Sequence, residues 1–215
     1  MSLCDKSPIW STFYKQSKAI ENIEYCRQKY GVELKLFAKE LKANGCRVFI
    51  VTNYYYFFQR YQKMKSSDKC WYEVIATQNA CKLYFDIEYL FEYNKSMSVA
   101  EGEKSIVIFI EQLIKYVHNK FKIIICEKDV IQLDSTTHSK FSKHLIIDST
   151  ELIFKNNLHC GQFVKNLCNY IKDEAKTIAS LNKLFIFDRN NQTTMFIDTS
   201  AVSYTHLRAH ETELH

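Results

Sequence analysis

The segment that most constrains the fold is residues 81–90, in which apolar and polar side chains alternate. Successive side chains of an extended strand point to opposite faces, so Asp86 and Glu88 share one face. The other face carries three large apolar side chains, those of Phe85, Ile87 and Tyr89. Residues 81–90 therefore predict a strand that packs one face against a core and presents two carboxylates on the other.

Strand and helix patterns alternate along the whole chain without an internal repeat. Apolar residues at helical spacing predict helices over about 8–30, 54–64, 106–117 and 160–179. Alternation and β-branched or aromatic residues predict strands over 33–41, 46–52, 71–75, 81–89, 130–133, 141–147, 183–188 and 193–198. Asn44-Gly45 is typical of a tight hairpin turn. This order predicts an α/β fold of the α+β type.

Local signals indicate where several elements begin and end. Ser7 followed by Pro8 is typical of a helix start, and Gly31 of a helix end. Asn53 is expected to cap the second helix. The aromatic run 54–58 in that helix is expected to be core rather than a platform for stacking bases. The polar residues 92–101 are expected to form a loop.

Composition narrows the possible function classes. The 215 residues include 4 Gly and 1 Pro, which excludes a glycine-rich phosphate loop. The net charge of +5 is compatible with an anionic partner but too diffuse to indicate one. None of the 8 Cys has zinc-knuckle spacing, so buried, reduced thiols are expected. The absence of a signal-peptide pattern and of any long apolar run predicts a soluble protein without a membrane partner.

The two carboxylates of the 81–90 strand favour a metal site. Two carboxylates ~4 Å apart repel by roughly 1 kcal/mol in water and by several times more near a protein surface. A hard cation such as Mg²⁺ or Mn²⁺ removes this repulsion and prefers oxygen ligands. A solvated strand face without a metal is the alternative that the spacing of Asp86 and Glu88 leaves open.

A second polar pattern lies between residues 134 and 147. In a strand that begins near Lys140, the side chains of Lys140, Ser142 and His144 share one face. A cation, a hydroxyl and an imidazole on one face can hold a phosphate, although a half-exposed strand with unrelated polar residues is the alternative. A third acid, Asp198, ends a short apolar strand, where carboxylates also occur as turn formers.

Six segments carry a resemblance to a known family: the helix around Trp10 and residues 47–52, 80–88, 133–146, 154–164 and 195–198. In this order, from about residue 8 to 198, they resemble the eukaryotic DNA-directed primase-polymerase (PrimPol) family. This family is part of the archaeo-eukaryotic primase superfamily. The resemblance implies a primase-polymerase catalytic core over 1–198, with two α/β modules over about 33–85 and 86–198. The second module would resemble an RNA-recognition-motif sheet.

The resemblance also implies a site and a reaction. Three carboxylates would hold two divalent ions, Mn²⁺ or Mg²⁺, and four other side chains would bind the triphosphate of the incoming nucleotide. The carboxylates are Asp86, Glu88 and Asp198, and the triphosphate ligands are Arg47, Lys140, Ser142 and His144. The reaction would be two-metal, template-directed nucleotidyl transfer from (d)NTPs to a 3′-hydroxyl. A nucleic-acid-binding fragment without catalysis is the alternative, and a two-metal nuclease is disfavoured because it needs no triphosphate clamp.

Further expectations follow from the resemblance alone. The partners would be a DNA template and primer, (d)NTPs and a single-stranded-DNA-binding protein, and the chain would be a monomer. The family works in the nucleus and the mitochondrion, in replication restart and damage tolerance, although no targeting signal is legible in this sequence.

The sequence departs from the family after Asp198. Family members continue with an Arg- and Asn-rich tract, a basic strand and a zinc-binding C-terminal domain. Residues 199–215 match none of these, so an unrelated tail and an incomplete core with weak or no activity are expected. His206, His210 and His215 of this tail are not expected to form a metal site, because no third ligand has a fixed position.

Overall fold

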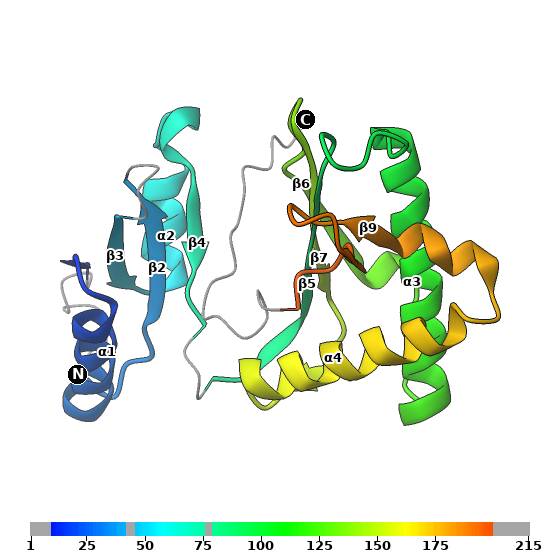
Figure 1. Cartoon of the computed structure of the whole chain (residues 1–215). Coiled ribbons are helices and arrows are strands. Elements are labelled where there is room, and N and C mark those ends of the chain that lie inside the picture. The colour runs from blue at the N-terminus through cyan, green and yellow to red at the C-terminus, as the bar shows by residue number, and fades with distance from the viewer. Residues whose placement is uncertain (1–9, 42–45, 76–78, 200–215) are drawn as a thin grey trace. The chain divides into compact units, whose positions relative to one another are not determined.

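The computed structural model describes residues 10–41, 46–75 and 79–199. They fall into two compact units, 10–75 and 79–199 (Figure 1). Both units combine helices with antiparallel sheets, which confirms the predicted mixture of α and β structure. In these described ranges no helix is both long enough and apolar enough to cross a membrane. Residues 200–215, where the sequence predicts an unrelated tail, lie outside the described residues.

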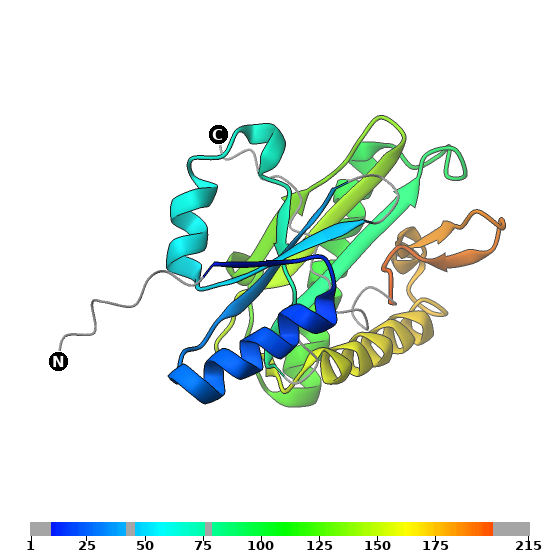
Figure 2. The ribbon, with the colours of Figure 1, turned by 90° about the vertical axis from the view of Figure 1, so that its left-hand side faces the viewer.

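The first unit is a four-stranded antiparallel sheet between two helices. The strand order is β1-β3-β2-β4, with bounds Ser11–Phe13, Arg47–Thr52, Lys35–Glu40 and Trp71–Glu73. Helix α1 (Gln16–Tyr30) buries Ala19 and Cys26 against one face, and Figure 2 shows it beside the strands. Helix α2 (Tyr54–Tyr61) packs on the other face, where Phe57 stacks on Phe37. A 3-10 turn, η1 (Ser66–Asp68), precedes β4.

Two predicted boundaries of the first unit are confirmed and one is wrong. Gly31 ends α1 with a left-handed φ of 63°, and the Asn53 side chain caps α2 by accepting from the amide of Tyr56. The predicted first helix begins too early, because residues 11–13 form β1. This segment pairs with the edge of β3, and helix α1 starts only at Gln16. Ser7 and Pro8 lie outside the described residues.

The second unit is built on a sheet with strand order β6-β7-β5-β8. The strands are β5 (Cys81–Leu90), β6 (Val130–Asp134), β7 (Lys140–Ile147) and β8 (Ile153–Phe154). Helices α3 (Val99–Phe121) and α4 (Asn157–Glu174) cover one face (Figure 1), and η2 (Glu127–Asp129) precedes β6. Phe85 meets Phe109 of α3, while Phe163 of α4 meets Tyr116 of α3. The apolar face predicted for β5 is therefore the packed one.

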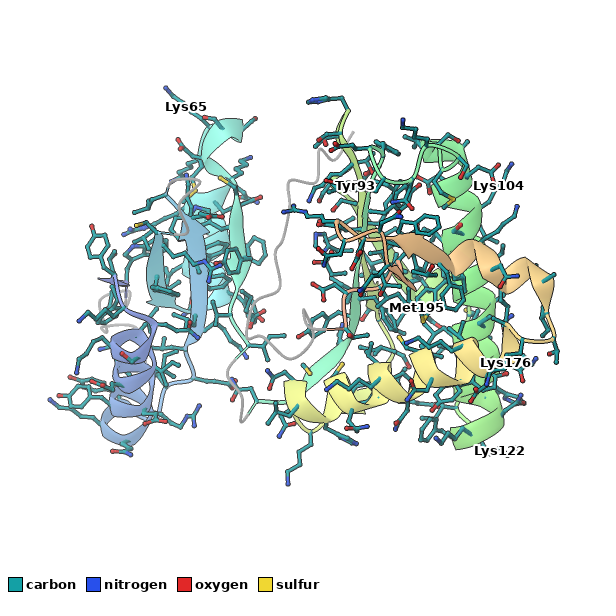
Figure 3. All side chains as sticks on the ribbon, in the orientation of Figure 1. Lys65, Tyr93, Lys104, Lys122, Lys176 and Met195 are labelled. Atoms are coloured by element: carbon teal, nitrogen blue, oxygen red, sulfur yellow. The ribbon has the colours of Figure 1, made fainter. Side chains whose placement is uncertain are left out.

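Helix α3 approaches the sheet closely because of one glycine. A Cβ atom at Gly102 would lie 2.6 Å from the ring of Phe141 and 2.6 Å from the hydroxyl of Tyr89. The helix starts at Val99, inside the predicted loop 92–101, and the Ser98 hydroxyl caps it by accepting from the amide of Glu101. Figure 3 shows Lys104 near the start of α3 and Lys122 just beyond its end.

The last part of the second unit returns to the sheet. After η3 (Ala179–Leu184), strands β9 (Phe185–Phe187) and β10 (Thr193–Met195) form a hairpin that projects at the edge of this unit in Figure 2. Both strands are shorter than predicted. Residues 196–198 leave β10 and join β5 through an isolated bridge between Ile87 and Ile197. The chain thus brings its last described acid to the middle of β5.

Candidate active site

The pairing of β5 with β7 gathers most of the predicted site residues on one face. Asp86 lies opposite His144, Glu88 opposite Ser142, and Leu90 opposite Lys140. Residues directly opposite each other on antiparallel strands have their side chains on the same face. The two acids and the three predicted phosphate ligands therefore project from the face that α3 and α4 do not cover.

Asp198 joins this group from the other edge of β5. Its backbone amide donates a hydrogen bond of 2.8 Å to the carbonyl oxygen of Asp86. The amide of Glu88 donates to the carbonyl oxygen of Phe196 at 3.0 Å. These two bonds flank the bridge at Ile197 and place the exposed Asp198 beside Asp86. The three predicted acids thus lie on adjacent backbone segments.

Positive and polar groups of β7 contact the acids directly. The Lys140 ammonium lies 2.6 Å from a carboxylate oxygen of Glu88. Nδ1 of His144 lies 3.5 Å from a carboxylate oxygen of Asp86. The side chain of His144 is 7% exposed and that of Glu88 is 44% exposed, so His144 is buried while Glu88 is accessible. Ser142, between the two basic residues, is also buried.

The loop between β6 and β7 holds the start of β7 in place. The hydroxyl oxygen of Thr137 accepts from the amides of Ser139 and Lys140, and that of Thr136 accepts from the amide of Ser142. The carboxylate of Asp134 accepts in turn from the amide of Thr136. Sequence reasoning assigned no role to these threonines, although hydroxyl residues that bond to nearby backbone amides are typical of tight turns.

Lys143 belongs to the opposite face of β7, between the two site residues Ser142 and His144. Its ammonium pairs with Glu103 of α3 at 2.7 Å and with Asp134 at 2.9 Å. Burial alone would lower the pKa of Lys143, but the hydrogen bonds and attraction from Glu103 and Asp134 outweigh it and raise that pKa. Lys143 therefore ties β7 to α3 and stays charged.

The donor set suits a hard divalent cation, because Asp86, Glu88 and Asp198 offer only carboxylate oxygens. Their side chains are not drawn into one coordination sphere. In the described part of the chain, no three His, Cys, Asp or Glu side chains are grouped closely enough to hold a metal ion. Glu88 instead faces Lys140. The three acids therefore fit a divalent cation by the chemistry of their oxygens, and the ion pair with Lys140 holds one of them.

Arg47, the remaining predicted site residue, begins β3 in the first unit. Its guanidinium carbon lies 6.0 Å from the ring centroid of Tyr72, at cation–π distance. It therefore belongs to a different unit from the other six predicted site residues.

The expected core role of the aromatic run 54–58 is wrong for most of its members. Phe57 is buried, but Tyr54, Tyr55 and Phe58 are 43%, 65% and 52% exposed. An eight-residue helix has only one face against the sheet, so neighbouring rings must turn outward. The outer side of α2 is consequently aromatic. Arg60, three residues after the buried Phe57, lies on the adjoining side of the helix, with its guanidinium carbon 4.0 Å from the ring centroid of Trp10.

Comparison with known proteins gives a consistent result. No family model matches the chain. The chain is 35% identical over 161 residues to the DNA-directed primase/polymerase protein of Bos taurus, which is 74% of this chain and 27% of that protein. It is 34% identical over 160 residues to the protein of that name in Homo sapiens, covering 74% and 27% of the two chains. For Mus musculus the values are 34% over 165 residues, 76% and 29%. The chain therefore spans less than a third of the length of these curated relatives.

Proposed function

This chain is a homologue of the vertebrate DNA-directed primase/polymerase proteins, and we propose that it carries the catalytic face of a template-directed DNA primase/polymerase. The reaction is nucleotidyl transfer from a (d)NTP to a 3′-hydroxyl on DNA. The observation that carries the proposal is the register of β5 and β7, which sets two carboxylates opposite a serine and a histidine on one face of the sheet. A surface that only binds nucleic acid has no use for carboxylates, because they repel phosphates.

The proposed metal ligands are Asp86, Glu88 and Asp198, and the proposed ions are two Mn²⁺ or Mg²⁺. Bound ions of this kind lower the pKa of the attacking hydroxyl and neutralise the charge of the triphosphate. The chain contributes the placement of the ligands. Asp86 and Glu88 are fixed by backbone pairing on both edges of β5. Asp198 is fixed by the hydrogen bond from its backbone amide to the carbonyl oxygen of Asp86.

The proposed triphosphate ligands lie on β7, next to these acids. The Ser142 hydroxyl donates to a phosphate oxygen, as does His144 through a ring N–H. Lys140 adds a full positive charge, and a charge-assisted hydrogen bond to phosphate is stronger than a neutral one. Arg47 of the first unit is proposed as a further phosphate ligand. The three groups of β7 together hold the leaving pyrophosphate.

The outer side of α2 is proposed as a contact for the template strand. Tyr55 and Phe58 expose their rings there, and Arg60 supplies a cation from the adjoining side of the helix, where it packs on Trp10. Exposed rings combined with cations are typical of surfaces on which unpaired bases stack. The nucleus and mitochondrion as locations, a role in replication restart and damage tolerance, and a single-stranded-DNA-binding partner stay predictions of the family resemblance.

The proposal is tested by Mn²⁺-dependent incorporation of labelled deoxynucleotide on a primed template. Asp86→Asn should abolish incorporation, because it removes a ligand charge with little change in shape. Asp148→Asn is the matched control, since Asp148 is an exposed acid of the same unit that pairs with Lys82. Incorporation at an undiminished rate by Asp86→Asn would contradict the catalytic role. DNA binding without incorporation by the unmodified chain would favour a binding fragment.

A further inference from the structure

Lys140 forms an ion pair with Glu88, one of the carboxylates that the proposed metal site needs. Its ammonium lies 2.6 Å from Glu88, and among the described residues no other carboxylate pairs with it. A divalent ion and an ammonium group both seek the same oxygens, and two cations a few ångströms apart repel each other. Lys140 and the metal therefore compete for Glu88.

The side chain of Lys140 is free to move away, whereas its backbone is held. The amide of Lys140 donates to Thr137, and β7 pairs with β5 along its length. The two paired side chains are 27% and 44% exposed, so the ammonium can turn towards solvent or a ligand. Lys143, on the opposite face, differs: its side chain is 9% exposed and pairs with two carboxylates. Of these two lysines, Lys140 is the one able to change partners.

We propose that Lys140 couples nucleotide binding to metal binding. Without nucleotide, Lys140 neutralises Glu88 and weakens the metal site. A triphosphate draws the ammonium to its own oxygens, and Glu88 is then available as a metal ligand. Coupling of this kind is reciprocal, so the metal must also strengthen nucleotide binding. The inference rests on the proposed function of this site and adds the order in which its ligands become available.

The test is a titration of the purified chain with Mn²⁺, in which the paramagnetic resonance signal of the free ion measures binding. Lys140→Met removes the competing charge and should bind Mn²⁺ about tenfold more tightly than the unmodified chain when nucleotide is absent. Lys140→Arg keeps the charge and should bind like the unmodified chain. Lys82→Met is the matched control, because Lys82 of β5 also pairs with a carboxylate, that of Asp148. Lys82 lies about 20 Å along the strand from Glu88.

A non-hydrolysable nucleotide triphosphate then tests the coupling. It should raise Mn²⁺ affinity more in the unmodified chain than in Lys140→Met, in which Glu88 is already available. Equal Mn²⁺ affinity of the unmodified chain and Lys140→Met without nucleotide would overturn the inference. So would a Lys82→Met variant that, without nucleotide, binds Mn²⁺ as tightly as Lys140→Met does.

Failure of the proposed function gives a different result from failure of the coupling. If Lys140→Met binds Mn²⁺ and the double variant Lys140→Met/Glu88→Gln binds it equally well, Glu88 is not a ligand even when its lysine is absent, and the proposed metal site is wrong. If neither the unmodified chain nor Lys140→Met binds Mn²⁺ at millimolar concentration, both proposals are wrong. Normal binding that depends on Glu88 but not on Lys140 overturns the coupling alone.

Discussion

At the scale of single residues, Ser142 is the proposed phosphate ligand whose side chain can be changed with the least effect on other contacts. It is buried between two basic residues and lies opposite Glu88. Ser142→Ala should raise the KM for the incoming nucleotide about tenfold, the effect of losing one hydrogen bond to a charged group. Steady-state kinetics on a primed template measure this change. Ser149→Ala, whose hydroxyl accepts from the amide of Glu151 outside the site, should leave KM unchanged.

Asp134 gives the molecule a predictable response to acid. Burial would raise the pKa of Asp134, but hydrogen bonds from Lys143 and Thr136 outweigh burial and lower it below its ordinary value of 3.8. A group whose pKa falls on folding stabilises the folded state while it is ionised. This contribution is therefore present above about pH 4 and is lost as the pH falls through the lower, folded-state pKa.

Urea unfolding at several pH values measures that response. Asp134→Asn should be less stable than the unmodified chain near neutral pH, and the difference should shrink as the pH falls from about 5 to about 2. A difference that stays constant over this range would show that the Asp134 charge does not stabilise the fold.

At the scale of secondary-structure elements, the packing of α3 depends on Gly102. Gly102→Ala places a methyl group 2.6 Å from Phe141 and Tyr89, so helix or sheet must shift. Overpacking of this kind costs about 1–3 kcal/mol of unfolding free energy, more than the helix propensity gained from alanine. Denaturant melts monitored by circular dichroism measure the loss. Lys104→Ala, at an exposed position of the same helix, should change stability by less than about 0.5 kcal/mol.

The elements that the sequence predicts well are those whose signals are local. The alternation in residues 81–90 suffices for β5, and Asn53 and Gly31 mark helix ends by their own chemistry. Strand β1 could not be predicted, because it forms only by pairing with the edge of β3. The start of α3 could have been: Ser98 followed by Glu101 is a helix-start signal that the polar composition of the segment concealed.

The site shows the same division between local and distant information. Alternation alone predicts that Asp86 and Glu88 share a face, and that Lys140, Ser142 and His144 share another. Only the register of β5 against β7 places both sets of residues on the same face of the sheet. Such a register joins segments that are far apart along the chain, and side-chain patterns within either strand do not specify it.

At the scale of the whole molecule, the two units each have their own sheet and their own core. The core of the first unit includes Ala19, Leu36, Phe49 and Val51, all within residues 10–75. Both tryptophans of the sequence, Trp10 and Trp71, also belong to that unit. Tryptophan fluorescence therefore reports the unfolding of the first unit, while circular dichroism reports both.

This arrangement predicts how a local change in one unit spreads. Gly102→Ala weakens the second unit, so the circular dichroism transition should shift to lower denaturant concentration. The tryptophan fluorescence transition should shift by less, because the core of the first unit is unchanged. Equal shifts by the two probes would show that the units unfold as one cooperative body.

The bridge that carries Asp198 also has a consequence for the time course of folding. As the chain emerges from a ribosome, β5 and β7 can pair well before residue 198 has been synthesised. The open face is then assembled in two stages, first with two acids and later with the third. Throughout the first stage Lys140 already neutralises Glu88. The nascent sheet can therefore close around its acid pair with the charge of Glu88 already balanced from within the chain.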